Sequence, residues 1–186
     1  MKRVLWLCVV LFVLSGCRAP DKNISRVLQF RESLIQSDGC AFRAKIAADY
    51  EQQVYHFTVD CKADREGNLS FTLVEPESIV GISGEVRADS GRLIFDNAVL
   101  GFPLLADGIL APVSGPWVML NALRSGYITA CSNMESGILV TVNDSYAEDA
   151  LELNVWVDDQ LTPFRGEIFW QGRRVLSLEL DKFEIL

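Results

Sequence analysis

Cysteines carry most of the reactive chemistry in this sequence. Of the five, Cys8 and Cys17 lie in or next to an N-terminal apolar stretch, and Cys40, Cys61 and Cys131 lie in the body of the chain. A thiol can accept a covalent group, form a disulfide, or stay buried as a small hydrophobic side chain. The surroundings of each cysteine therefore decide which of these roles it can take.

Cys17 follows a segment with the pattern of an export signal. Lys2 and Arg3 provide a positive start, and the unbroken apolar run 4–14 is too short to span a bilayer, which takes about 20 apolar residues. Two small residues stand directly before the cysteine. We therefore expect the chain to leave the cytoplasm.

The sequence Leu14-Ser15-Gly16-Cys17 resembles the lipobox of bacterial lipoproteins. The resemblance implies that Cys17 receives diacylglycerol, that the signal peptide 1–16 is removed, and that the new amino terminus is acylated. Several acyl chains, at about 0.8 kcal/mol per buried methylene group, anchor a protein stably. We expect the protein in the cell membrane or outer membrane, lipid-anchored and facing outside the cytoplasm. The alternative, a buried N-terminal helix with an incidental cysteine, leaves the basic start unexplained.

Length and charge define one acidic domain after the signal. Residues 17–22 form a short lipidated tether, and residues 23–186 form a single domain with room for a proper core. The whole chain has a formal charge of -8, and loss of Lys2 and Arg3 makes the mature protein more acidic. Anionic headgroups and nucleic acid repel such a surface. No nucleic-acid partner is expected, and the membrane is contacted through the lipid.

Cys40 and Cys61 are expected in one β-hairpin. Two strand-like segments surround a turn, and a turn centred on Tyr50 and Glu51 places Cys40 directly opposite Cys61. The same register puts the apolar residues of both strands on one face. A disulfide between Cys40 and Cys61 is one interpretation, and three buried reduced cysteines are the other. Cys131 is a further partner if its strand lies alongside.

Helical periodicity occurs twice. Residues 23–37 carry apolar side chains at helical spacing and end at Asp38-Gly39. A second helix is expected after Ser114, which can cap it, and ends at Gly126. An amphipathic helix needs a surface to cover, and a sheet would supply one.

The remaining segments read as strands. Apolar and polar residues alternate in them, which is typical of an antiparallel meander with one covered face. Between residues 98 and 109 apolar and polar residues no longer alternate, and we expect an apolar loop there. Because an apolar loop should not stay exposed, it is expected to pack against the domain or to cover part of it. The predicted fold class is α+β: a curved antiparallel sheet, an unclosed β-barrel of about nine or ten strands, with helices covering its concave face.

The order of these elements resembles the LolA/LolB family of lipoprotein carriers. A leading amphipathic helix, a meander with the strand 71–76, a hairpin over 81–95, an apolar loop with a second helix, and closing strands carry the resemblance over most of the mature chain. It implies a hollow, lidded by helices, that binds acyl chains of lipoproteins or other lipids. A lid-locking arginine and a protruding apolar residue for membrane delivery are not identifiable, so neither is carried over.

Inward-facing apolar side chains would line this hollow. They are Phe42, Ile46, Tyr55, Phe57, Phe71, Leu73, Ile82, Leu93 and Phe95 from the strands, and Trp117 from the second helix. Ligand pockets are mostly apolar concavities, so we expect a lipid or lipoprotein ligand. The alternative is a core plugged by Trp117 and the loop around Phe102. The chain would then be an interaction or sensor module that contacts another envelope protein.

The sequence lacks the residue combinations of an enzyme. His56 is the only histidine and falls on the polar face of its strand, and Ser114-Gly115 lacks the Gly-x-Ser-x-Gly frame of a nucleophile elbow. Acidic residues around Asp144 and Asp158 could bind calcium, but they are read more simply as solvated turns. We therefore predict a binding protein without catalytic residues, metal or cofactor.

Overall fold

The computed structural model describes residues 22–88, 90–96, 98–106 and 109–186. The predicted signal peptide 1–16, the attachment site Cys17 and all of the tether except Lys22 lie outside the described residues. Within the described part there are two α-helices, α2 (Lys22–Gln36) and α3 (Gly115–Ser125). No helix in this part is long and apolar enough to cross a membrane.

An antiparallel sheet of eleven strands forms most of the domain. Its strands are β1 (Gly39–Asp49), β2 (Val54–Asp64), β3 (Leu69–Glu75), β4 (Ser83–Val86), β5 (Ser90–Phe95), β6 (Ala98–Pro103), β9 (Tyr127–Met134), β10 (Gly137–Asn143), β11 (Glu152–Val157), β12 (Pro163–Trp170) and β13 (Arg173–Ile185). Their spatial order is β6-β5-β4-β3-β2-β1-β13-β12-β11-β10-β9. Two meanders are thus joined where β1 pairs with β13.

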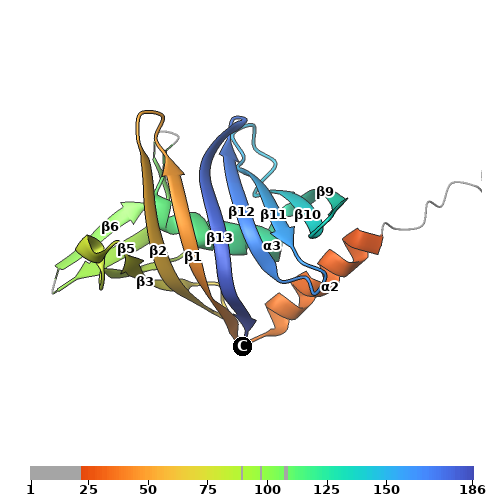
Figure 1. Cartoon of the computed structure of the whole chain (residues 1–186), viewed down its shortest axis with the longest axis horizontal. Coiled ribbons are helices and arrows are strands. Elements are labelled where there is room, and N and C mark those ends of the chain that lie inside the picture. The colour runs from red at the N-terminus through yellow and green to blue at the C-terminus, as the bar shows by residue number, and fades with distance from the viewer. Residues whose placement is uncertain (1–21, 89, 97, 107–108) are drawn as a thin grey trace, which may run out of the picture.

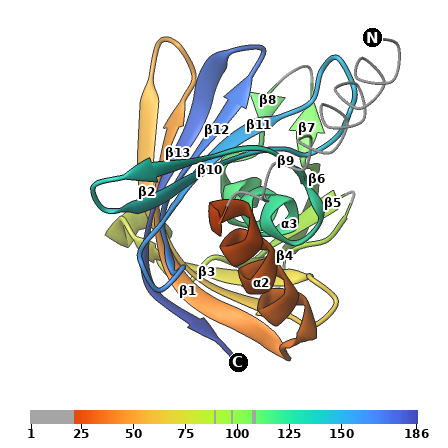
Figure 2. The same cartoon turned by 90° about the vertical axis from the view of Figure 1, so that its right-hand side faces the viewer.

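The sheet curves around both helices without closing. Figure 1 shows its strands edge to edge, and Figure 2 shows α2 and α3 inside the curve. Strands β6 and β9 end the sheet on its two sides. The predicted α+β class, curved sheet and helix placement are confirmed.

The predicted strand count is too low because residues 98–103 form β6 rather than a loop. Val99 and Leu100 are both exposed although they point to opposite faces of the strand. Since all residues of this edge strand except the partly buried Phe102 are exposed, its sequence does not alternate. The short hairpin of β7 (Leu105–Ala106) and β8 (Ile109–Leu110) follows in the same segment.

Both predicted helices are present with their expected ends. In α2 the buried stripe is Val27, Phe30 and Leu34. At the end of α3 the N–H of Gly126 donates to the Ala122 carbonyl oxygen at 2.8 Å. Ser114 does not cap α3 with its side chain, because its hydroxyl donates to the Ala111 carbonyl oxygen instead, at 2.6 Å.

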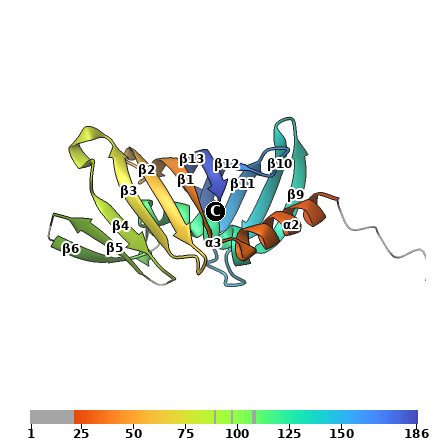
Figure 3. The same cartoon turned by 90° about the horizontal axis from the view of Figure 1, so that it is seen from below.

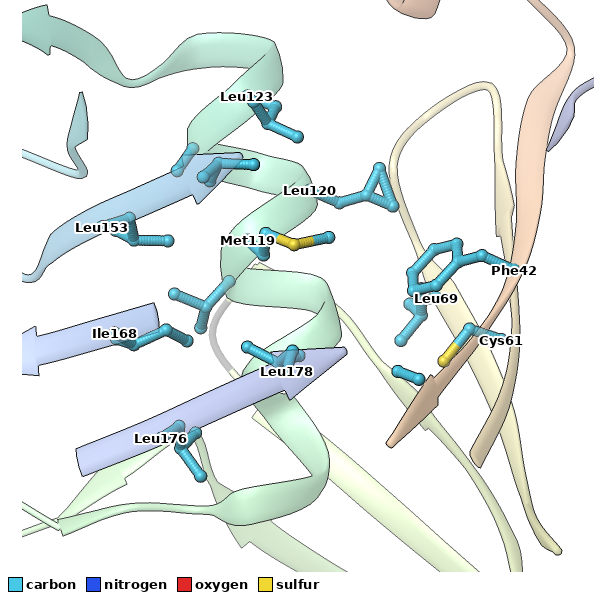
Figure 4. Packing of buried hydrophobic residues seen from close by; sticks show 14 of the residues in the cluster. Phe42, Cys61, Leu69, Met119, Leu120, Leu123, Leu153, Ile168, Leu176 and Leu178 are labelled. Atoms are coloured by element: carbon cyan, nitrogen blue, oxygen red, sulfur yellow. The ribbon is translucent and has the colours of Figure 1, made fainter. Parts of the chain in front are cut away.

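The core lies between α3 and the two meanders. Figure 4 shows Met119 of α3 between Leu153 of β11 and Ile168 of β12 on one side and Phe42 of β1 on the other. Met119 is fully buried, and its sulfur lies 3.0 Å from where a Cβ on Gly166 would be. The absence of a side chain at Gly166 therefore makes room for the helix against β12.

Candidate functional site

On the concave face of the sheet, side chains become exposed to solvent toward the edge strand β6. One cross-strand row, each member directly opposite the next, consists of Phe42, Cys61, Phe71, Gly84, Leu93 and Leu100. Phe71 is 3% exposed, whereas Leu100, at the end of the row, is 64% exposed. The same face of the sheet thus changes from core to surface within three strands.

The placement of the helices explains this change. Helix α3 packs against β10, β11, β12 and β13, and α2 packs against β1, β9 and α3. Figure 3 shows β5 and β6 at the end of the molecule opposite to α2. The concave surface of these two strands is therefore left open.

We name the concave surface formed by Ile82, Leu93, Phe95, Leu100 and Phe102 the open apolar end. Phe95 and Leu100 are exposed, and the other three are partly buried against the edge of the core. The ring of Phe102 occupies the space over Gly91, since a Cβ there would lie 2.1 Å from the ring. A glycine on β5 is thus used to seat an aromatic side chain of β6.

The ten residues predicted to line a hollow fall into three groups. Phe42, Ile46, Phe71 and Leu73 are buried in the core. Phe57, Ile82, Leu93 and Trp117 are partly buried and pack against it. Tyr55 and Phe95 are about half exposed. The structure brings Ile82, Leu93 and Phe95 together at the open apolar end, while Tyr55 lies at the start of β2.

Trp117 is fixed against the turn that joins β2 and β3. Its indole N–H donates to the Gly67 carbonyl oxygen at 2.9 Å. About two turns further along α3, a guanidinium N–H of Arg124 donates to the Arg65 carbonyl oxygen at 2.7 Å. The helix is therefore held at two points to the β2–β3 turn, beside the buried part of the row.

A hollow of about 410 Å³ lies at the other end of the molecule, beside α2. Its apolar surface comes from Phe30, Leu161, Phe183 and Ile185, and its polar surface from Gln29, Ser33, Gln160 and Thr162. Arg26 donates to the Asp159 carbonyl oxygen at 2.7 Å and so ties α2 to the β11–β12 turn. The mixed lining of this hollow suits an apolar ligand less well than the open apolar end does.

The convex face has a shallow hollow of about 400 Å³ with charged walls. Lys45 and Glu179 are cross-strand partners there, and the Thr58 hydroxyl donates to the Glu75 carboxylate at 2.6 Å. His56 is exposed beside them, on the polar face that the alternation predicts. The walls of this hollow are thus polar and charged, which does not suit an apolar ligand.

Cys40 and Cys61 are free thiols, and the predicted register of their hairpin is wrong. Cys61 lies opposite Phe42 and Cys40 opposite Ala63, because the turn is centred one residue later than predicted. A shift of two in the pairing keeps both cysteines on the concave face, where they are buried. Burial raises the pKa of Cys40 to about 12 and also raises that of Cys61. Cys40 and Cys61 therefore fit the interpretation in which buried, reduced cysteines act as small hydrophobic residues.

Glu167 on the convex face is a buried carboxylate that the sequence reasoning missed. It is 7% exposed, and its Oε1 accepts hydrogen bonds from Arg165 at 2.7 Å and Arg174 at 2.9 Å. The Arg165 guanidinium also lies 4.7 Å from the ring centre of Trp156. No signal in the sequence marks this cluster, because charged residues on a strand normally indicate a solvated face.

The acidic turns use their carboxylates to order the backbone. Asp144 Oδ1 accepts the N–H of Leu151 at 2.9 Å, and Asp158 Oδ1 accepts the N–H groups of Gln160 and Thr162, each at 2.8 Å. Across the residues that the structure describes, no group of three histidine, cysteine or acidic side chains gathers as it would around a metal ion. Asp144 and Asp158 therefore stabilise turns, as the simpler of the two interpretations predicts.

Comparison with known proteins finds likeness of fold only. No protein-family model matches the sequence, and no curated protein does. An uncharacterized conserved protein from Thermus thermophilus is 13% identical, over 89% of this chain and 88% of that chain, with a TM-score of 0.48. A LolA superfamily protein from Nitrosomonas europaea is 10% identical, over 89% and 94%, with a TM-score of 0.45.

A further solved structure of this kind is a putative outer membrane lipoprotein-sorting protein domain from Vibrio parahaemolyticus. It is 10% identical, over 86% of this chain and 91% of that chain, with a TM-score of 0.47. A LolA superfamily protein and a lipoprotein-sorting protein domain are thus among the solved structures that the chain is similar to. The likeness extends to the fold and no further.

Proposed function

We propose that this chain is a lipid-anchored envelope protein that holds an apolar ligand on its open apolar end. Cys17 is the proposed attachment site, after removal of residues 1–16. The ligand is an acyl chain, free or as part of a lipid or lipoprotein. The observation that carries the proposal is the loss of cover from Phe71 to Leu100 along one row of the concave face.

The side chains of this surface suit an apolar ligand and no charged one. Strands β4, β5 and β6 direct only glycine and apolar residues to the concave side: Gly84, Val86, Gly91, Leu93, Phe95, Ala98, Leu100 and Phe102. The charges of these strands lie on the convex side, where Arg92 and Glu85 form an ion pair at 2.7 Å. Covering apolar surface contributes about 25 cal/mol per Å². An acyl chain laid over β5 and β6 would cover the exposed apolar surface of Phe95 and Leu100.

Two neighbouring residues of β6 offer a matched test. Leu100 and Val99 are 64% and 65% exposed, yet Leu100 points to the concave side and Val99 to the convex side. Displacement of a fluorescent fatty acid is measured on the full chain, and co-purifying lipid is identified by mass spectrometry. Leu100→Ser is expected to weaken fatty-acid binding about tenfold, while Val99→Ser leaves it unchanged. Equal effects of both, or no saturable binding, would exclude this surface as the ligand site.

The edge position of β6 favours a second candidate function. As the last strand of the sheet, β6 has an outer edge without a partner strand in the described part of the chain. Such an edge can pair with an extended segment of another envelope protein. Val99→Lys places a charge on this edge. Loss of a bound partner with fatty-acid binding unchanged would support the interaction module instead of the carrier.

A further inference from the structure

Helix α2 has a second apolar stripe that faces solvent. Ile24, Leu28 and Ile35 are 37%, 47% and 46% exposed, although Val27, Phe30 and Leu34 of the same helix are buried. The spacing of four and seven residues places these three on one flank of the helix. Three large apolar side chains in line on a surface helix indicate a surface that is covered in the working protein.

The charge of α2 is opposite to that of the chain. The helix carries Lys22, Arg26 and Arg31 against one carboxylate, Glu32, a net of +2, whereas the whole chain is -8. The guanidinium groups of Arg26 and Arg31 donate to backbone carbonyl oxygens, which carry no net charge. Arg26 is thus directed to the β11–β12 turn and Arg31 to the last turn of α3, so neither charge lies on the apolar flank.

The proposed anchor holds this helix near the membrane. Five residues separate Cys17 from the first turn of α2, counting Lys22. A fully extended chain spans at most about 3.6 Å per residue, so Lys22 stays within about 18 Å of the lipidated residue. Figures 1 and 3 place the start of α2 and the β5–β6 end at opposite ends of the molecule.

We propose that the flank of α2 formed by Ile24, Leu28 and Ile35 lies on the membrane surface. Its apolar side chains enter the interface between headgroups and acyl chains. This docking rests on the proposed lipid anchor at Cys17. It directs the open apolar end away from the membrane that holds the protein, toward ligands that arrive from elsewhere in the envelope.

Site-specific fluorescence quenching tests this orientation on the full lipidated chain. In a Cys131→Ser background, an environment-sensitive label is attached to Leu28→Cys, to Gln29→Cys or to Gly101→Cys. Gln29 is exposed on the other flank of α2, and Gly101 lies on β6 with open space where a Cβ would be. The protein is reconstituted in vesicles of phosphatidylcholine and phosphatidylglycerol in equal parts, with quenchers on the lipid headgroups.

The label at position 28 is expected to be quenched severalfold more than that at 29, and the label at 101 not at all. Changing Ile24 and Ile35 to serine together should lower the quenching at 28. Equal quenching at 28 and 29, or strongest quenching at 101, overturns the docking. The intact mass separates the two proposals: a chain that carries the lipid but shows equal quenching keeps its anchor and loses the docking. A chain without the lipid loses both.

Discussion

Arg31 and Arg124 cap each other's helices. Arg31 of α2 donates to the carbonyl oxygen of Leu123 at 2.7 Å, in the last turn of α3. Arg124 of α3 donates to the carbonyl oxygen of Leu34 at 3.2 Å, in the last turn of α2. The carbonyl groups of a last turn lack partners within their own helix and form the negative end of its dipole. The two arginines thus join the C-terminal ends of both helices inside the curve of the sheet.

Arg31→Ala is expected to lower the free energy of unfolding by about 1–2 kcal/mol, because charged hydrogen bonds to the end of α3 are lost. Burial lowers the pKa of Arg31, but a guanidinium stays protonated at neutral pH. Urea unfolding followed by circular dichroism measures the change.

Arg173→Ala is the control, since its guanidinium reaches the Asp49 carbonyl oxygen only at 3.5 Å, on the exposed side of the sheet. If both variants unfold at the wild-type urea concentration, the caps contribute nothing to stability.

This pair of arginines shows where sequence reasoning ends. The helices and most strands could be predicted because periodicity of 3.6 and alternation of 2 record which face is buried. Arg31 and the carbonyl of Leu123 are 92 residues apart, and a contact with a backbone atom leaves no pattern in the sequence.

The candidate site was predicted in part. Leu93 and Phe95 follow from alternation on β5, whereas Leu100 was assigned to a loop because every residue of β6 except Phe102 is exposed. The hairpin register also failed, since the polar residues between Asp49 and Gln53 allow more than one turn centre, and the N–H of Tyr50 bonds to the Gln53 carbonyl oxygen. Burial of a whole face can be predicted more securely than the exact position of a turn.

Gly84 and Gly101 are expected to respond differently to the same substitution. A Cβ on Gly84 would lie 2.4 Å from the Arg92 carbonyl oxygen and 2.5 Å from the Phe71 ring, whereas a Cβ on Gly101 meets nothing within 4 Å. Gly84→Ala should therefore cost about 1–3 kcal/mol of stability through overpacking, and Gly101→Ala close to nothing. Thermal unfolding of both variants measures this. Equal melting temperatures would mean that Phe71 can leave its place over β4 without cost.

The thiols of Cys40 and Cys61 are expected to be unreactive in the folded protein. Their raised pKa values leave almost no thiolate near pH 8, and both side chains are buried. In a Cys131→Ser variant, a water-soluble thiol reagent should modify them only as denaturant unfolds the chain. Rapid modification under native conditions would contradict the burial. A chain that stays unmodified even when unfolded, and whose mass is lower by two hydrogen atoms, would show the disulfide instead.

Arg43 and Asp60 make stability depend on pH on the acidic side. Arg43 donates from Nε to Asp60 Oδ1 at 2.6 Å and from Nη2 to Oδ2 at 2.8 Å. These hydrogen bonds from Arg43 hold the pKa of Asp60 below its ordinary value of 3.8. A carboxyl group with a lower pKa in the folded state stabilises the fold above its unfolded pKa, and this contribution disappears as the pH falls through the folded pKa.

Asp60→Asn should therefore unfold slightly earlier than the wild type at neutral pH, by a small margin because both side chains are well exposed. The difference should close as the pH is lowered through and below 3.8. Added salt should reduce the difference at neutral pH, since exposed ion pairs are screened. Melting temperatures of both proteins across this pH range measure the effect. A difference that persists in acid would have its cause in packing, because by then Asp60 is protonated and its charge no longer distinguishes the two proteins.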